Sequence, residues 1–186
     1  MGQPPLFYRN LLRLNHLAEE CTGWLFLPGM LFEDKSTWWK NTPRRSPHEG
    51  LDLLYFSDRY GQRRELPEQT LVPPIRAGEV IAIFDDFLGS TVAVRHPLLD
   101  KEGWRLLSLY GHVRPLVGCG EQISAEEPLA EVARGKVRGV SAPPDHLHLS
   151  LGWLAPGWPP TELRWPALWT NPGIRLMDPL VLPMAE

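Results

Sequence analysis

Proline is the residue that most restricts how this chain can fold. The 186 residues include 20 prolines, about twice the usual share. A proline ring fixes φ and removes a backbone N–H, which excludes proline from helix interiors and central strands. Hydrophobic residues make up 43% of the chain, so we do not expect disorder, which requires low hydrophobicity. The chain should therefore consist of short elements joined by long, stiffened loops.

The apolar residues fall in short runs with the composition of β-strands. These runs are rich in β-branched and aromatic residues and are separated by Gly, Pro and Asp, as strands and turns require. They read WLFL, LDLLYF, EVIAIF, STVAVRH, WRLLSLYGHV and HLHLSLGWL, with IRLMDPLVL as a closing strand after a Trp- and Pro-rich loop over residues 152–172. We therefore expect a mainly β fold based on an antiparallel sheet.

The first residues have the period of a helix instead. Over residues 5–20, one stripe of an amphipathic helix would hold Leu11, Leu14, Leu17 and Ala18. His16 would lie on the surface of this short N-terminal helix. The length suits a single domain, in which we expect a helical extension over residues 1–23 and a β domain over residues 24–186.

Charge and cysteine content exclude several classes of protein. A net charge of −3 lacks the basic footprint of a nucleic-acid partner. Cys21 and Cys119 form no CxxC motif, so we expect buried free thiols rather than disulfides or a thiolate metal site. No apolar run reaches 18 residues, so we expect no transmembrane segment. The start shows no signal-peptide pattern, which leaves localisation, like oligomeric state, undetermined.

Four of the six histidines stand in settings that suggest chemistry. His48 and Asp52 lie four positions apart in PHEGLD, His112 ends a strand in LYGHV, and His146 and His148 lie in PPDHLHLSL. Period-two alternation would put His146 and His148 on one strand face. Imidazole and carboxylate are standard zinc ligands, and a catalytic zinc site has three protein ligands and one open position.

The spacing of these residues favours a metal site but leaves its membership open. Four residues of extended strand cover about 13 Å, so His48 and Asp52 cannot reach one ion from a straight strand. Gly50 between them would permit the necessary bend or bulge. An isolated HxH is usually a wet strand face, and two same-face histidines can also bind one ion together. The combination of motifs makes a metal site the better interpretation.

Together these motifs resemble a known family. The segments HEGLD (48–52), YGH (110–112) and HLH (146–148), in this order, resemble the three motifs of the lysostaphin/LytM-type zinc metallopeptidases. The resemblance extends to IRAGEVIAI, STVAVRHP and DPLVL and covers roughly Trp24 to Pro183. It implies an antiparallel β-sheet groove and a bound zinc ion, Zn2+. Members of this family are usually extracytoplasmic.

The resemblance also implies a function and a role for each residue. It implies a zinc-dependent metalloendopeptidase that hydrolyses peptidoglycan stem peptides or cross-bridges, with His48, Asp52 and His148 as zinc ligands. His146 would be the general base for a zinc-activated water, and His112 would bind that water or the developing oxyanion. The alternative is a non-hydrolytic module that uses the same groove to bind peptidoglycan or a partner protein.

The chain departs from the family pattern near the HLH segment. SAPPD stands where the family has a Gly-rich turn, and Glu127 stands where a glycine would be expected. These regions contact substrate in the family, so the resemblance does not identify the scissile bond. Four tryptophans follow, at positions 153, 158, 165 and 169; they either pack the proline-rich loop or form a stacking wall for peptide or glycan. We interpret His96 as a structural strand-end histidine.

Overall fold

The computed structural model describes residues 5–135, 142–165 and 168–181. The described residues contain one α-helix, α1 (Leu6–Leu14), and one 3-10 helix, η1 (Pro160–Glu162). The strands found in them are β1 (Cys21–Leu25), β2 (Leu51–Leu53), β3 (Tyr55–Asp58), β4 (Arg63–Glu65), β5 (Leu71–Val72), β6 (Gly78–Asp85), β7 (Ser90–Leu99), β8 (Arg105–Pro115), β9 (Gln122–Ile123), β10 (Ala130–Val132), β11 (Leu147–Leu154) and β12 (Ile174–Met177). The prediction of a mainly β fold with one short N-terminal helix is confirmed.

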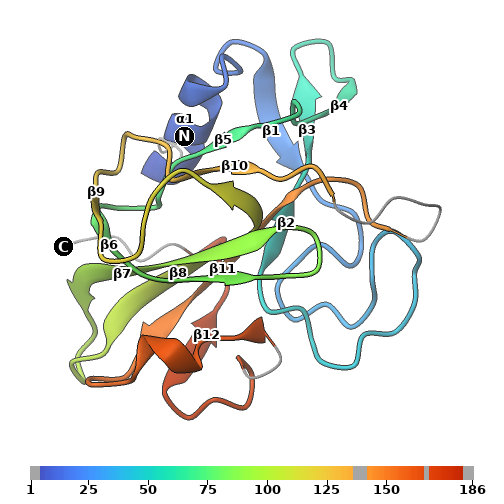
Figure 1. Cartoon of the computed structure of the whole chain (residues 1–186). Helices are drawn as coiled ribbons and strands as arrows, with labels where there is room; N and C mark the ends of the chain where they lie inside the picture. The colour runs from blue at the N-terminus through green and yellow to red at the C-terminus, as the bar shows by residue number, and fades with distance from the viewer. Residues whose placement is uncertain (1–4, 136–141, 166–167, 182–186) are drawn as a thin grey trace.

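The strands form two antiparallel sheets. The larger sheet runs in the order β12-β11-β8-β7-β6-β9, with β2 paired to β11 and with β10 paired to both β5 and β8. The smaller sheet has the order β1-β3-β4. Figure 1 shows α1, β1 and β5 at one end of the molecule and β12 at the other, with the long strands β7, β8 and β11 between them. The central position of β8 and β11 matters for the site, because both carry histidines.

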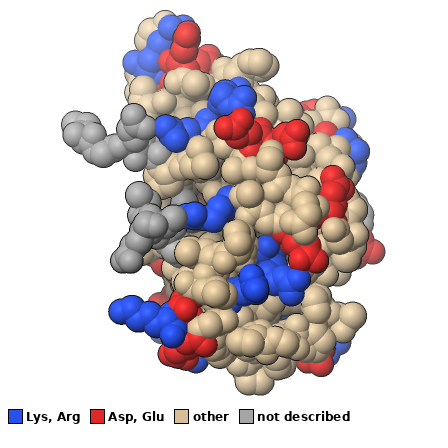
Figure 2. All heavy atoms as spheres, turned by 90° about the vertical axis from the view of Figure 1, so that its left-hand side faces the viewer, with Lys and Arg blue, Asp and Glu red and all other residues tan. Residues whose placement is uncertain are grey.

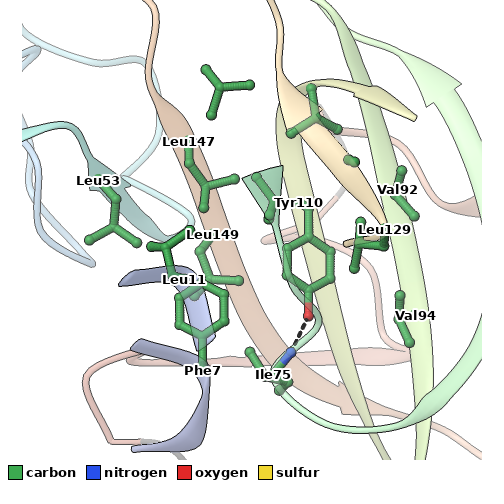
Figure 3. Close-up of a cluster of buried hydrophobic side chains, with 14 of the residues drawn as sticks. Phe7, Leu11, Leu53, Ile75, Val92, Val94, Tyr110, Leu129, Leu147 and Leu149 are labelled. Atoms are coloured by element: carbon green, nitrogen blue, oxygen red, sulfur yellow. Dashed lines mark hydrogen bonds between the residues drawn. The ribbon is translucent and has the colours of Figure 1, made fainter. Parts of the chain in front are cut away.

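The main core lies between α1 and one face of the larger sheet. Figure 3 shows Phe7 and Leu11 of α1 against Leu149 of β11, with Tyr110 of β8 beside them. The Tyr110 hydroxyl accepts a hydrogen bond of 2.7 Å from the backbone N–H of Ile75. This bond satisfies a buried polar atom that would otherwise destabilise the core. On the opposite face of the sheet, Ala93, Leu107 and Leu109 belong to a second core cluster.

Helix α1 is shorter than the predicted helix over residues 5–20. The Asn15 side-chain amide donates to the Leu11 carbonyl and to the Leu71 carbonyl, each at 2.8 Å. These bonds replace the next helical hydrogen bond and tie the helix end to β5. His16 then adopts a left-handed φ of 58°. It is exposed, as predicted, but it lies after the helix rather than on it.

Two other predictions on the fold need correction. Cys119 is exposed and Cys21 is only half-buried, because Cys119 lies in the turn between β8 and β9 and Cys21 begins a strand of the outer sheet. The closing strand β12 ends at Met177, where the Asp178 carboxylate accepts the backbone N–H of Leu180 and forms a turn. The last residue of that predicted strand, Leu182, lies outside the described residues.

Charges on the surface are mixed in sign. Figure 2 shows basic and acidic side chains next to each other at several places on the face that it presents. Ion pairs of this kind include Arg95 with Glu79 and Arg175 with Glu102. No helix among the described residues is long and apolar enough to cross a membrane.

Candidate metal centre

The register of β11 brings the three predicted metal ligands together. β11 lies between β2 and β8, so that His148 is opposite both Asp52 and Gly111. His148 and Asp52 are 96 positions apart in the sequence, and sheet pairing alone makes them neighbours. His48 joins them in a buried group whose ligand atoms lie within 4.8 Å of one another.

The side chains of β11 alternate between the core and the pocket. Leu147 and Leu149 belong to the main core, so His148 and Ser150 lie on the opposite face. His146 immediately precedes β11 and lines the same pocket as His148. Ser150 Oγ lies 2.8 Å from Nε2 of His148, which holds the ring from the side away from Asp52.

Gly50 is needed for a different reason from the one predicted. Its φ is not in the left-handed region, so glycine is not required for an unusual backbone angle. A Cβ at this position would instead overlap the Leu149 carbonyl oxygen and lie 2.8 Å from Nε2 of His148. Glycine thus allows the chain before β2 to lie directly against β11. This close approach brings His48 near His148.

Three donor atoms converge on one point at the centre of the group. Nε2 of His48 lies 3.1 Å from Nδ1 of His148. Both nitrogens lie close to Oδ1 of Asp52, at 3.2 and 2.9 Å respectively. Ligands that are each about 2.1 Å from a tetrahedral zinc ion are roughly 3.4 Å apart. The triangle formed by these atoms is therefore close to the size that zinc requires.

The outer hydrogen bonds leave the inner nitrogens free to act as ligands. Nδ1 of His48 must donate its hydrogen, because its partner is the Leu31 carbonyl oxygen at 3.0 Å. In the neutral ring, Nε2 of His48 then carries a lone pair. Nε2 of His148 can donate to Ser150, which frees Nδ1, and burial lowers the pKa of His148 to about 3. Converging lone pairs and a carboxylate oxygen repel each other unless a cation lies between them, so this donor set fits a metal ion.

The second oxygen of the Asp52 carboxylate has protein partners of its own. The Trp38 indole N–H donates to Oδ2 at 2.8 Å, and the Arg44 guanidinium lies 3.8 Å from the same oxygen. Burial opposes ionisation of Asp52, but the imidazoles of His146 and His48 hold the pKa of this carboxyl well below its usual range. Asp52 is thus a carboxylate with Oδ1 directed at the converging nitrogens.

A bulge in β8 turns His112 toward the pocket. Gly111 and His112 lie opposite the single residue Thr91 of β7, which is the pattern of a β-bulge. His112 has a φ of 63°, in the left-handed region that non-glycine residues seldom adopt. Tyr110 and Val113, on either side of the bulge, both pack in the main core. The extra residue therefore places His112 on the pocket face, where regular alternation would have placed it in the core.

Both predicted catalytic histidines are held by Nδ1. Nε2 of His146 lies 3.4 Å from Oδ1 of Asp52, at the edge of the metal-ligand group. Nδ1 of His146 donates to the Pro144 carbonyl at 2.7 Å, and Nδ1 of His112 donates to Oδ1 of Asp86 at 3.0 Å. Burial lowers the pKa of His146, but the Asp52 carboxylate outweighs it and raises that pKa above its ordinary value. Burial keeps the pKa of His112 below its ordinary value, although Asp86 opposes this. The two rings lie 4.9 Å apart.

These residues share one open pocket of about 520 Å³. Its walls include Trp39, Phe84, Phe87 and Trp165. The four tryptophans at positions 153, 158, 165 and 169 do not act alike. Trp165 lines the pocket, with its ring 4.8 Å from that of His148, whereas Trp153 and Trp158 pack against the core and Trp169 donates to the Pro47 carbonyl.

The unusual rim of the pocket is only partly described. Ser141 of SAPPD lies outside the described residues. The Asp145 carboxylate accepts the backbone N–H of Gly135 at 2.7 Å, so this acidic side chain forms a hydrogen bond within the rim itself. Glu127 is exposed and accepts the Ser124 hydroxyl at 3.1 Å.

Sequence reasoning did not find three residues that hold the site. Ser150 could have been found, because DHLHLSL places it on the same strand face as the two histidines. Trp38 and Asp86 gave no signal. Each contacts a histidine or carboxylate that is distant in sequence, and no local period reports such a contact.

Comparison with solved structures finds similarity to lysostaphin and to LytU. The chain is similar to the solution structure of lysostaphin, with 15% identity and a TM-score of 0.40, over 67% of this chain and 43% of that one. It is similar to the catalytic domain of the antimicrobial peptidase lysostaphin from Staphylococcus simulans, with 13% identity and a TM-score of 0.41, over 81% and 90%. It is also similar to LytU, with 18% identity and a TM-score of 0.45, over 80% and 90%.

The chain thus spans less than half the length of the whole lysostaphin chain that it matches. No model of a protein family matches the sequence, and no curated protein matches it.

Proposed function

We propose that this chain is a zinc-dependent metalloendopeptidase that hydrolyses peptide bonds of peptidoglycan. The observation that carries the proposal is the convergence of Nε2 of His48, Oδ1 of Asp52 and Nδ1 of His148 within 3.2 Å, beside two further histidines in one pocket. The order and spacing of the three sequence motifs, which resemble those of lysostaphin/LytM-type peptidases, support the same function. Peptidoglycan as the substrate rests on this resemblance.

In this proposal His48, Asp52 and His148 hold the zinc ion. Bound zinc would supply a Lewis acid that polarises the scissile carbonyl and makes water nucleophilic near neutral pH. Trp38 keeps Oδ2 of Asp52 occupied, so that the carboxylate presents Oδ1 alone. Ser150 Oγ, 2.8 Å from Nε2 of His148, can accept the ring hydrogen there, and Nδ1 then carries a lone pair for the metal.

His146 and His112 would carry the protons. His146 has a hydrogen on Nδ1, fixed by the Pro144 carbonyl, so Nε2 can accept the proton of the attacking water and return it to the leaving amine. Nε2 of His112 can accept a hydrogen bond from the same water. When the second hydrogen of this water passes to Nε2, His112 can donate it to the developing oxyanion. The water oxygen joins the carbonyl carbon, the C–N bond breaks, and the proton held by His146 leaves with the amine. The proton held by His112 is released to solvent as the product carboxylate forms.

Cleavage of purified peptidoglycan tests this function. Zinc-loaded protein should release peptides with new amino termini from sacculi, and a chelator should stop the release until zinc is restored. The expected metal content is one zinc per chain. Zinc-loaded, folded protein that cleaves no sacculi and no synthetic stem or cross-bridge peptide would contradict the proposal. If such protein still bound sacculi, the non-hydrolytic alternative would be supported instead.

A further inference from the structure

Asp86 is a buried carboxylate close to the pocket whose role no sequence motif indicates. It follows β6, in the hairpin turn that leads to β7, and its side chain is only 1% exposed. Oδ1 accepts the backbone N–H groups of Leu88 and Gly89 at 2.9 and 2.8 Å, which is the usual use of an aspartate in a turn. These two bonds explain the presence of an aspartate in the turn, but both involve Oδ1 and neither involves Oδ2.

The remaining hydrogen bonds of Asp86 go to a residue 26 positions later in the sequence. Oδ1 also accepts Nδ1–H of His112 at 3.0 Å, and Oδ2 accepts the backbone N–H of His112 at 2.8 Å. One carboxylate thus binds both the ring and the backbone of the same histidine. The backbone bond holds the residue whose φ is 63°, at the point where the β8 bulge turns the ring toward the pocket.

A chain of hydrogen bonds with a fixed direction links Asp86 to the pocket wall. The Trp165 indole N–H can only donate, and it donates to Thr91 Oγ1 at 2.8 Å. The Thr91 hydroxyl in turn donates to Oδ2 of Asp86 at 2.9 Å. Leu88, Gly89, Thr91 and His112 thus all donate to the Asp86 carboxylate. Burial opposes ionisation, but the hydrogen bonds and charge of His112, together with the backbone N–H of Gly89, hold the pKa of Asp86 well below its usual range.

We propose that Asp86 is a positioning residue for His112: it holds the ring as the Nδ1–H tautomer, with Nε2 toward the pocket, and it holds the bulge that puts the ring there. A carboxylate that only accepts leaves Nδ1 no role except donation. His146 is held in the same tautomer by a neutral carbonyl. The negative charge near His146 is that of Asp52, which lies 3.4 Å from Nε2. The Asp86 carboxylate instead lies on the Nδ1 side of His112, where it stabilises the ring once Nε2 has accepted a proton. The catalytic consequence rests on the proposed function, whereas the tautomer does not.

Nitrogen-15 NMR of the histidine rings tests the proposal without any assay of activity. In zinc-loaded protein labelled at histidine, the His112 signals, assigned with His112→Gln, should show hydrogen on Nδ1. Asp86→Ala should shift His112 toward the Nε2–H form that free histidine prefers, while the His146 signals keep the Nδ1–H pattern. Asp86→Asn keeps an oxygen for Nδ1 and should restore most of the Nδ1–H form, and it also serves if Asp86→Ala does not fold.

Asp100→Ala is the matched control for the turn. Oδ1 of Asp100 accepts the backbone N–H groups of Glu102 and Trp104 in the hairpin between β7 and β8. It thus has the same turn function as Asp86 without a histidine partner. Asp100→Ala should lower thermal stability and leave the His112 tautomer unchanged. If folded Asp86→Ala or Asp86→Asn protein showed only the same loss of stability, with His112 still entirely Nδ1–H in the alanine variant, Asp86 would be a turn residue and the proposal would be wrong.

Kinetics on a cleaved peptide test the catalytic consequence separately. Asp86→Ala should lower kcat by at least about tenfold, with KM and zinc content unchanged. In a His112→Ala background, Asp86→Ala should have no further effect on kcat, because it acts through the ring that is missing. Equal losses in both backgrounds would overturn the positioning role. Absence of any cleavage by the wild-type protein would overturn the proposed function but not the NMR result.

Discussion

Two buried histidine sites of this protein use the same residue type in opposite ways. His96 and His48 are each only 1% exposed. In His96, Nδ1 is hydrogen-bonded to the Ala77 carbonyl at 3.0 Å and Nε2 to the Ser108 hydroxyl at 2.8 Å. In His48, Nδ1 is hydrogen-bonded to the Leu31 carbonyl, but Nε2 faces His148 and the Asp52 carboxylate.

The difference shows how a structural histidine can be told from a candidate ligand. The neutral His96 ring has a protein partner on each side, so it needs nothing more, and the Ser108 hydroxyl continues to that of Tyr110 at 2.9 Å. In the group of His48, Asp52 and His148, the inner atoms contact one another at 2.9 to 3.2 Å. The two sites are equally buried, but only at His96 do both ring nitrogens have a carbonyl or hydroxyl partner.

The largest effect on zinc binding and cleavage should come from removal of a predicted zinc ligand. His48→Ala, Asp52→Ala and His148→Ala should each reduce bound zinc from one per chain to nearly none and abolish cleavage. Wild-type protein should also gain about 4 kcal/mol of stability when free zinc is 1,000 times its Kd, a gain that the variants should lack. Metal analysis and thermal unfolding with and without zinc measure both effects.

Histidine controls separate the ligands from other histidines. His16→Asn changes an exposed histidine at a left-handed position that asparagine tolerates, and it should bind zinc as the wild type does. His96→Gln should be less stable yet bind zinc equally. Loss of stoichiometric zinc in folded His96→Gln protein would mean that the two sites are not distinct.

The second-largest effect is expected from the histidine next to the metal group. His146→Ala removes the proposed general base but none of the three proposed ligands, so rates should fall by about 10²- to 10⁴-fold with zinc retained. Parallel measurement of kcat and metal content checks this expectation. If the variant lost zinc, the division of the HLH pair into base and ligand would be wrong.

The third effect is a pH dependence of the stability that the structural histidine His96 contributes. Burial lowers the pKa of His96 to about 4, whereas an unfolded chain protonates histidine near pH 6.5. Between these values the unfolded state binds more protons, so the contribution of His96 to stability falls as pH decreases from about 6.5 to 4. The loss is roughly 3 kcal/mol, since one pKa unit corresponds to about 1.4 kcal/mol.

Comparison with a His96 variant isolates this contribution from the other titrating groups. Urea unfolding at pH 7 and pH 4 should show that the stability difference between wild type and His96→Gln shrinks on the acid side. The same difference at both pH values would show that His96 is not held neutral by the fold.

The smallest effect should come from the partner of Asp52. Trp38→Phe removes the indole N–H that binds Oδ2 but keeps an aromatic ring against His146 and Tyr55. Partners that orient metal ligands typically contribute 10- to 100-fold in affinity, and we expect zinc affinity to fall by about tenfold. Zinc titration against a competing chelator measures this change, with Trp39→Phe as the neighbouring control. An unchanged Kd would show that Trp38 does not orient the carboxylate.

Much of the fold was predictable because its signals are local. Strand composition and alternation located β6, β7, β8 and β11 within a few residues, and they placed His146 and His148 on one side of the strand. The short strands β4, β5, β9 and β10 were missed, because two or three residues carry no period and form through pairing with longer neighbours. The burial of Cys21 and Cys119 was wrongly predicted because residue type alone does not reveal a turn or an outer sheet.

The sequence by itself determined which residues are candidates for the site: His48, Asp52 and His148 as ligands and His112 and His146 as catalytic histidines, with a glycine at position 50. Residue chemistry and strand period are properties of neighbouring residues, so they can be read from the chain. Only the tertiary structure decided which nitrogen of each ring faces inward, that Gly50 serves close approach rather than a bend, and that Asp86 lies behind His112. These features depend on strand register and on a bulge between segments as many as 96 positions apart, and no local pattern records them.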